Sequence, residues 1–331
     1  MISDEDLNTA VAAGVVSAEA AAALRAHASQ RGRSPLVDEE HFRLVSGFND
    51  IFVVIASLLL LASIAWIGSD QARWVGAVGV SITAWLLSEF FVRIRRLALP
   101  AIALLLAFVG GVFVAAHDVL GLFAEGRGAV SSGLAILAAW LHWRRFQVPI
   151  TVAAGAAATA AFVVLSLLAV IPDSSVWLLP MCFVAGLAIF GVATKWDATD
   201  RDRLTRRSDV AFWLHLLAAP LLVHPVFTQM GVFSGITSPA QTVVVFAMYL
   251  ALALVSLAID RRALVVSALG YVLYALATLL RQNGFVSLSF AYTGLVIGSA
   301  LLMLSAYWNK SRAMTLGRLP GTLRAHLAPL R

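Results

Sequence analysis

The sequence predicts an all-α integral membrane protein, and three observations carry this prediction. Of the 331 residues, 60% are hydrophobic and 13% are charged, whereas soluble domains average about 45–50% apolar and about 25% charged residues. The apolar residues gather in runs of about 20, the helix length that crosses a hydrocarbon core of about 30 Å. The charged residues lie mostly between these runs. The composition excludes an ordinary soluble enzyme and a disordered chain, and the unbroken runs exclude the alternating strands of a β-barrel.

About ten apolar runs are long enough to be membrane-spanning helices. They lie near residues 50–68, 73–92, 97–116, 128–146, 149–171, 176–195, 208–227, 240–259, 262–281 and 287–307. The fourth and seventh runs are the least uniformly apolar, because the fourth ends in histidine and arginine and the seventh contains histidine and proline. We therefore predict a ten-helix transmembrane domain over residues 42–307.

The basic residues predict the orientation of these helices. With a cytoplasmic N-terminus and ten crossings, 21 of the 24 Lys and Arg residues fall on the cytoplasmic side. The outer side receives Arg73, Arg127 and Arg281. Positive charge collects in the cytoplasmic loops of membrane proteins, so both termini are expected in the cytoplasm. The acidic start of the sequence lacks the features of a cleavable signal peptide.

Residues 1–41 are predicted to form a cytosolic helical hairpin and a polar linker. Ser3 precedes three acidic residues that favour a helix N-terminus, and Gly14 suits the end of that helix. Ser17 then caps a second helix that ends near Gln30. Because so few large apolar residues occur here, we expect the hairpin to contact a protein partner, a second copy of the chain or its own membrane domain.

Residues 308–331 are predicted to form a basic amphipathic cytosolic tail. Five leucines recur at helical spacing, on one stripe: Leu316, Leu319, Leu323, Leu327 and Leu330. Pro320 interrupts this pattern, so the tail is either a turn followed by a helix or a kinked helix. A basic amphipathic segment that follows a membrane span favours binding to anionic lipid at the inner leaflet. Docking of a protein onto the tail is the alternative.

The two ends of the chain carry a family resemblance. One motif is Gly14-Val15-Val16-Ser17-Ala18-Glu19 at the turn of the hairpin, and the other combines Trp308, Arg312 and Leu319-Pro320 with the residues that follow. With the multi-span domain between them, the chain resembles uncharacterised bacterial polytopic membrane proteins classed as domains of unknown function. The resemblance implies a bacterial inner (cytoplasmic) membrane protein and no particular chemistry.

Sequence motifs of common enzymes are not found. The chain has no Walker A loop, no HExxH, no CxxC and no GxSxG sequence, and Cys182 is the single cysteine, which excludes an internal disulfide. The seven histidines are scattered, whereas a structural zinc site needs several ligands close together. We therefore expect no enzyme activity, no metal, no cofactor and no nucleic-acid partner.

Several ionisable residues near the ends of the spans are candidates for a substrate or proton pathway, although each also has a simple structural explanation. Asp50 begins the first span, at the interface, and Glu89 precedes Arg93 by four residues, which favours a structural ion pair on one helix face. His117 and Asp118 end the third span. Adjacent side chains on a helix point about 100° apart, so these two are not expected to bind one ligand together.

His215 is the strongest candidate. It lies seven residues after Ser208, so about 10 Å into the membrane core, between apolar residues. Pro220 frees a backbone carbonyl near residue 216. Either His215 is a proton relay or substrate contact, or it is a neutral histidine hydrogen-bonded to a neighbouring helix. Tyr271 and Tyr274 are the partners that the sequence suggests.

Two functions remain open at this point. A small-solute transporter or permease is favoured by the number of spans. Ten spans divide into two halves of five with opposite orientation, and such inverted repeats recur among transporters. A non-transporting scaffold, sensor or envelope-maintenance protein is favoured by the hairpin and by the scarcity of charge at the membrane midplane. A membrane enzyme ranks third, because it would need clustered acidic residues or histidines at one face.

Overall fold

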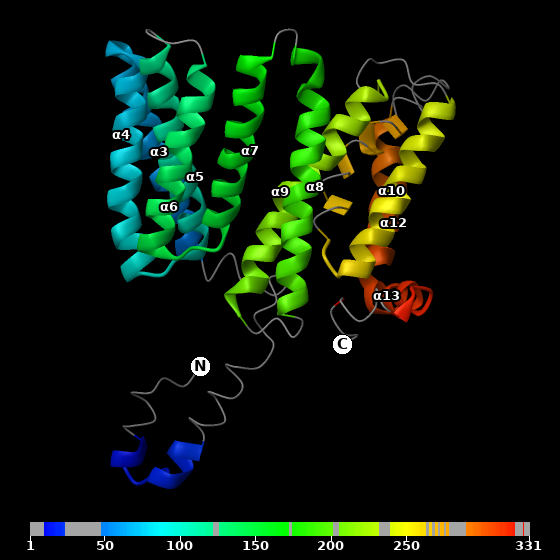
Figure 1. Ribbon diagram of the computed structural model, residues 1–331. Helices are drawn as coiled ribbons and strands as arrows, with labels where there is room; N and C mark the ends of the chain where they lie inside the picture. The colour runs from blue at the N-terminus through cyan, green and yellow to red at the C-terminus, as the bar shows by residue number, and fades with distance from the viewer. Residues whose placement is uncertain are drawn as a thin grey trace.

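The computed structural model describes an all-helical chain with no strand among its described residues (Figure 1). These residues are 10–23, 48–121, 126–171, 174–200, 205–231, 239–262, 265–266, 269–270, 272–274, 276–277, 289–321 and 327. Within them, six helices are long and apolar enough to cross a membrane. The long apolar helices fit the predicted class of all-α membrane protein.

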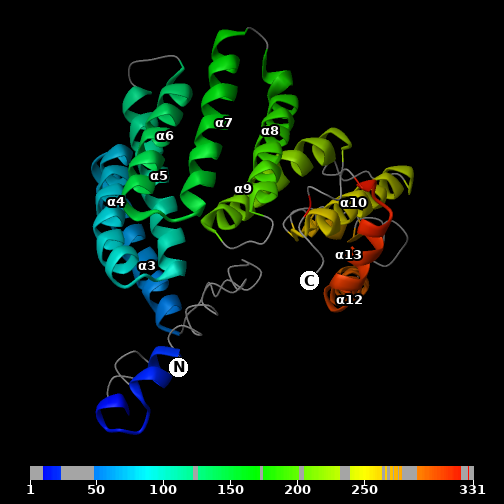
Figure 2. The same ribbon diagram turned by 60° about the horizontal axis from the view of Figure 1, so that its bottom comes forward.

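The helices follow one another up and down through the bundle. Their bounds are α3 Phe48–Gln71, α4 Arg73–Ser88, the π-helix η2 Glu89–Ile94, α5 Ala98–Leu120, α6 Arg127–Phe146, α7 Ile150–Val170, the 3₁₀ turn η3 Ser174–Trp177, α8 Leu178–Thr199, α9 Arg206–Gln229, α10 Pro239–Ile259, α12 Ser289–Ala306 and α13 Trp308–Gly317. In Figure 1, α3 to α6 group at one side, α7 to α9 lie in the middle, and α10, α12 and α13 group at the other side. Figure 2 shows the same order in the turned view.

Nine of the ten predicted spans coincide with a described helix, α3 to α10 and α12. The six that meet the length and composition of a span are α3, α4 with η2, α5, α7, α8 with η3, and α9. The α6 helix is about as long as predicted, Arg127–Phe146. It is not among the six apolar helices, and its end contains the histidine and arginines noted in the sequence. The predicted ninth span, 262–281, falls largely outside the described residues. The count of ten therefore stays a prediction.

Four apolar clusters join the helices in order along the bundle. The first links α3, α4 and α5 through residues such as Leu61 and Leu104, and the second links α5, α6 and the start of α7. The third packs α7, α8 and α9 around small residues that include Ala193 and Ala218. The fourth joins Val223 and Phe227 of α9 to α10 and α12. Each cluster shares a helix with the next, so the described residues form a row of linked clusters.

Small residues let neighbouring helices approach closely. A Cβ atom added to Gly186 of α8 would lie 2.9 Å from the Cβ of Leu221 on α9, a separation that a side chain does not tolerate. Close backbone approach at glycine is typical of helices that pack within a membrane. Large apolar side chains such as Leu59, Ile82 and Leu302 are exposed on the outside of the bundle, as a bilayer requires.

Elements from both ends of the chain lie beyond the same end of the bundle (Figure 1). In the N-terminal segment, residues 10–12 and 18–23 are helical, Gly14 has φ +67°, and the Ala20 amide donates to Ser17 Oγ at 3.1 Å. These contacts confirm the predicted roles of Gly14 and Ser17; Ser3 and Gln30 lie outside the described residues.

The described helix of the C-terminal tail lies earlier in the chain than the helix that the leucine pattern predicts near Pro320. The α13 helix starts at Trp308 and ends at Gly317, before Pro320. Its axis is bent by 74° from that of the preceding membrane helix, Ala291–Ala306. This sharp bend fits a helix that lies along the membrane surface rather than through it. Of the predicted leucine stripe, Leu323 and Leu330 lie outside the described residues.

Candidate functional site

A buried ionic network joins the ends of α8, α9 and α10. Arg261, directly after α10, is 0% exposed. Its Nη2 atom donates to Asp197 Oδ1 of α8 at 2.7 Å, and its Nε donates to Asp197 Oδ2 at 3.2 Å. The same Nη2 donates to the hydroxyl and carbonyl oxygens of Ser208 in α9, at 2.9 and 3.2 Å. One arginine therefore contacts two other helices with two-pronged, charge-assisted hydrogen bonds.

His215 belongs to this network. Its Nε2 lies 3.1 Å from Asp197 Oδ2, and its ring packs edge-on against Phe190, with 5.2 Å between ring centroids. The side chain is fully buried. The candidate that the sequence ranked first thus contacts a carboxylate on a neighbouring helix. Tyr271 lies outside the described residues.

Local structure explains why these side chains meet. The α8 helix continues to Thr199, one turn beyond the predicted span, and this turn carries Asp197. After α10, Asp260 adopts φ +58°, a left-handed conformation that ends the helix and turns Arg261 back toward α8. Ser256 secures this turn, because its carbonyl accepts from the Arg261 amide at 3.0 Å and its hydroxyl donates to the Arg261 carbonyl.

The residue before Arg261 anchors the C-terminal tail. Asp260 Oδ1 accepts from Trp308 Nε1 at 2.8 Å and lies 3.5 Å from Arg312 Nε. The Arg262 guanidinium lies 4.8 Å from the centre of the Trp308 ring. Three consecutive residues therefore connect α10 to the α8–α9 pair on one side and to α13 on the other.

The network places a histidine and an arginine on one carboxylate. Histidine is a residue type that can carry or release a proton. When His215 is charged, Asp197 has two cationic partners; when it is neutral, Arg261 alone balances the carboxylate. Within the described residues, no three His, Cys, Asp or Glu side chains are arranged to hold a metal ion.

Glu89 forms the predicted ion pair and a second one. Arg93 Nη1 lies 3.2 Å from Glu89 Oε2, which confirms the expected pairing along one helix. Arg145 of α6 adds two hydrogen bonds to Glu89, of 2.6 and 2.9 Å. All three side chains are partly exposed. This cluster therefore lies on other helices than the Asp197 network and is in contact with solvent.

Asp50 lies in the first turn of α3, where a carboxylate complements the helix dipole. The sequence placed it at the interface, but its side chain is 1% exposed. The position agrees with the interpretation that Asp50 stabilises the start of the helix. The structure does not bring Asp50 into the Asp197 network.

His117 and Asp118 face different partners, as predicted from their adjacency. His117 stacks on Phe113, with ring centroids 5.7 Å apart, and Asp118 lies 3.4 Å from Arg73 Nε. The two residues therefore do not form a joint binding site with each other.

His142 lies near the end of α6. It is fully buried, with Nδ1 3.2 Å from Thr151 Oγ1, and its ring packs against Trp85, Phe108 and Phe146. Aromatic side chains of α4, α5 and α6 therefore cover a histidine near the end of a predicted span.

Sequence reasoning missed Asp197, Ser208 and Arg261 as members of a site. They follow or precede apolar runs, where charged and polar residues are common and carry no signal of their own. The predicted topology does contain a signal for them. The sixth span ends, the seventh begins and the eighth ends at the cytoplasmic face, so Asp197, Ser208 and Arg261 are predicted at the same depth in the membrane.

No protein-family model, no curated protein and no solved structure matches the chain. The resemblance to an uncharacterised bacterial family thus stays a prediction.

Proposed function

We propose that the chain is an inner-membrane transporter or permease for a small solute, with ten spans and both termini in the cytoplasm. In this proposal Asp197, His215 and Arg261 form the gate that closes its cytoplasmic end. The observation that carries it is the fully buried Arg261 side chain, which bridges α8 and α9 from the end of α10. Buried charge within membrane helices is costly, and it marks functional positions more often than structural ones.

The network has the properties that a gate needs. It joins the α10–α13 group to α8 and α9 by side chains at one end of the bundle, while apolar residues such as Val223 and Phe227 make the contact nearer the other end. Its bonds are polar and can exchange for water. A proton on His215 changes the balance of charge around Asp197, so protonation would shift the gate between two states.

Cysteine accessibility tests this gate. In a Cys182→Ala background, Ala193→Cys places a thiol one helical turn from Asp197, at a fully buried position. We expect that Arg261→Met opens the gate and exposes this thiol to a membrane-impermeant maleimide added from the cytoplasmic side. Ala84→Cys is the control, because Ala84 is equally buried but lies in the α3–α5 cluster, so its labelling reports general unfolding.

The outcomes separate a gate from a structural contact. Labelling at Ala193→Cys with protection at Ala84→Cys supports a gate. Protection of both thiols, or exposure of both, contradicts it and favours the alternative function, a scaffold, sensor or envelope-maintenance protein.

A specific observation favours this alternative. The three described grooves of the bundle are lined almost wholly by apolar atoms, and residues 10–23 and α13 lie beyond the same end of the bundle (Figure 1). In a scaffold, these elements would contact a protein partner or a second copy of the chain, with the basic tail on anionic lipid. Deletion of residues 1–40 would then remove co-purifying protein but leave the membrane domain folded.

The predicted topology can be tested independently of the gate. Thiols introduced at Ser34→Cys and Ser311→Cys should react with an impermeant reagent in inverted membrane vesicles and stay protected in intact cells. Labelling of either position from outside would contradict the ten-span, cytoplasmic-termini arrangement.

A further inference from the structure

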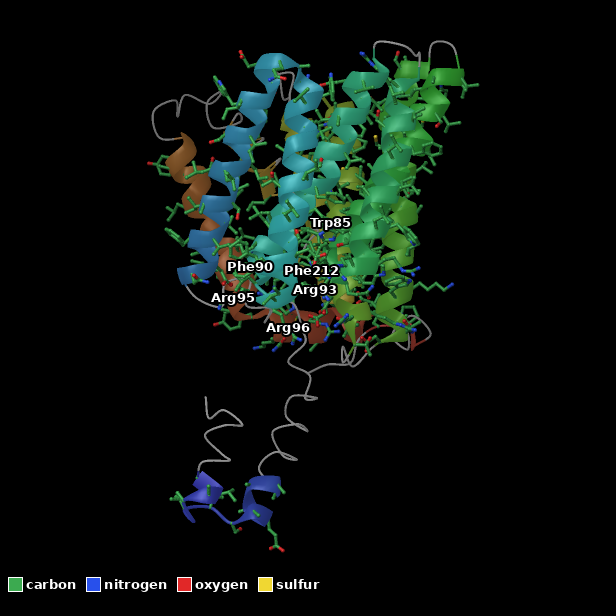
Figure 3. The ribbon with its side chains drawn as sticks, turned by 90° about the vertical axis from the view of Figure 1, so that its left-hand side faces the viewer. Trp85, Phe90, Arg93, Arg95, Arg96 and Phe212 are labelled. Carbon is green, nitrogen blue, oxygen red and sulfur yellow. The ribbon has the colours of Figure 1, made fainter. Side chains whose placement is uncertain are left out.

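A cluster of five arginines occupies one edge of the bundle, at the predicted cytoplasmic end. Arg93, Arg95 and Arg96 lie at and after the end of η2, and Arg144 and Arg145 end α6. In Figure 3, Arg93, Arg95 and Arg96 lie at the lower end of the helices, with Phe90 above them and Trp85 higher still. Positive charge is expected at the cytoplasmic end of a membrane protein, but the proposed gate does not use these five arginines.

Glu89 holds two of these arginines side by side. Its carboxylate accepts from Arg93 at 3.2 Å and from Arg145 at 2.6 and 2.9 Å, so guanidinium groups from two helices are fixed near each other. Their side chains are 56% and 40% exposed, which leaves other N–H donors accessible. One carboxylate offsets only part of the charge of the cluster.

Aromatic rings support the neighbouring arginines. The Arg95 guanidinium lies 5.6 Å from the centre of the Phe90 ring, and the Arg144 guanidinium lies 5.2 Å from that of Trp140. Cation–π contacts of this kind hold a guanidinium close to an apolar surface. The charges are therefore held at the level where lipid headgroups meet the membrane core.

An apolar groove lies along the same helices, farther into the membrane. It has a volume of about 460 Å³ and is lined by residues of α4, α5 and α6. Ile82 and Leu86 of α4 line this groove and are exposed. They precede Glu89 by seven and three residues, which places them on its face of the helix. The groove thus leads toward the arginine cluster.

We propose that this edge binds an anionic phospholipid, with its phosphate on Arg93 and Arg145 and one acyl chain in the α4–α6 groove. Charge complementarity selects an anionic headgroup, and basic pockets between membrane helices at the cytoplasmic side bind such headgroups. A free phosphate would use the arginines alone, and a neutral lipid would use the groove alone. The two features together fit an amphiphile.

Lipid binding to the purified full-length protein tests the proposal. The probe is dioleoylphosphatidylglycerol, and dioleoylphosphatidylcholine, with the same acyl chains and no net charge, is the reference; both are followed by native mass spectrometry. The wild-type protein should prefer the anionic lipid. Since each surface arginine contributes about fivefold to such binding, Arg93→Gln/Arg145→Gln should weaken binding of phosphatidylglycerol roughly twentyfold and leave that of phosphatidylcholine unchanged.

The matched control removes the same charge elsewhere. Arg206→Gln/Arg207→Gln alters two exposed arginines at the start of α9, at the same predicted face, and should change binding less than about twofold, because their distance weakens the interaction with the headgroup. If the first variant does not fold, the single variant Arg93→Gln leaves the Glu89–Arg145 pair intact and should weaken binding of phosphatidylglycerol about fivefold. Equal losses in the α4–α6 variants and in the control would overturn the proposal.

A groove-filling variant distinguishes the lipid from a simple anion. Leu86 lines the end of the groove nearest to Glu89 and the arginines, and Leu86→Trp should weaken binding of both lipids. Inorganic phosphate in excess should not displace phosphatidylglycerol from the wild-type protein. Unchanged lipid binding in Leu86→Trp, or full displacement by phosphate, would show an anion site without an acyl-chain groove and would overturn the proposal. None of these outcomes depends on whether the protein transports a solute.

Discussion

Asp197 and Glu89 are carboxylates with similar partners in opposite surroundings. Asp197 contacts His215 and Arg261, and Glu89 contacts Arg93 and Arg145. Arg261 and His215 are fully buried, whereas both arginines of Glu89 are exposed. A buried charge that loses its partner cannot turn to water, but an exposed one can. The comparison teaches that the contribution of an ionic contact to stability depends on the burial of its partners and not on the number of contacts.

The largest effect is expected when Asp197 loses its arginine. Arg261→Met keeps the length of the side chain but leaves the carboxylate with His215 alone. Unfolding should become easier by about 3 kcal/mol, the low end for a buried pair, because the Asp197 side chain is 18% exposed. Denaturation by sodium dodecyl sulfate, followed by tryptophan fluorescence, measures this. Arg262→Met is the control, since Arg262 is adjacent but exposed.

Removal of both charges should reverse most of this loss. Asp197→Leu/Arg261→Met replaces the pair with apolar groups, which buried sites often accept at little cost. A double variant no more stable than Arg261→Met would contradict the view that the unpaired carboxylate causes the damage.

His215 is expected to have the next largest effect. His215→Gln retains a group that can hydrogen-bond to Asp197, so its effect on stability should be small. His215→Leu removes the hydrogen bond and should cost about 1–3 kcal/mol. If His215 also takes part in gating, His215→Gln should abolish transport while its unfolding curve stays near that of the wild type. Wild-type stability and phenotype in both variants would show that His215 has neither role.

A smaller and more local effect is expected at the tail. Trp308→Phe keeps the aromatic ring but removes the N–H that donates to Asp260, which should weaken the attachment of α13 by about 1 kcal/mol. Limited trypsin cleavage at Lys310 should become faster, with the stability of the membrane domain unchanged. Unaltered cleavage would show that Arg312 and packing hold the tail without this bond.

The smallest effect is expected at Glu89. In Glu89→Gln the exposed arginines regain water, so the detergent unfolding curve should overlap that of the wild type, and any difference seen at low salt should disappear at high salt. A loss of stability as large as that of Arg261→Met would contradict the distinction between the two clusters.

The sequence predicted the features that depend on local pattern. Run length located nine described helices, and spacing predicted the Glu89–Arg93 pair and the capping by Ser17. Depth within an apolar run also identified His215. Arg145 and Arg261 could not be assigned in this way, because they reach their carboxylates across 56 and 64 residues of sequence. Such contacts depend on which helices become neighbours, and hydrophobic pattern alone does not encode that choice.

The long separation between Asp197 and Arg261 has a consequence for synthesis of the chain. At about 5–20 residues per second, the 64 residues between them take several seconds to emerge from the ribosome. About halfway through that interval α9 is completed at Gln229, and Asp197 can meet His215, which is only 18 residues away. The histidine thereby gives the nascent hairpin a polar contact before the arginine exists. Replacement of His215 would then lower the yield of protein inserted into the membrane, even where the folded protein is stable.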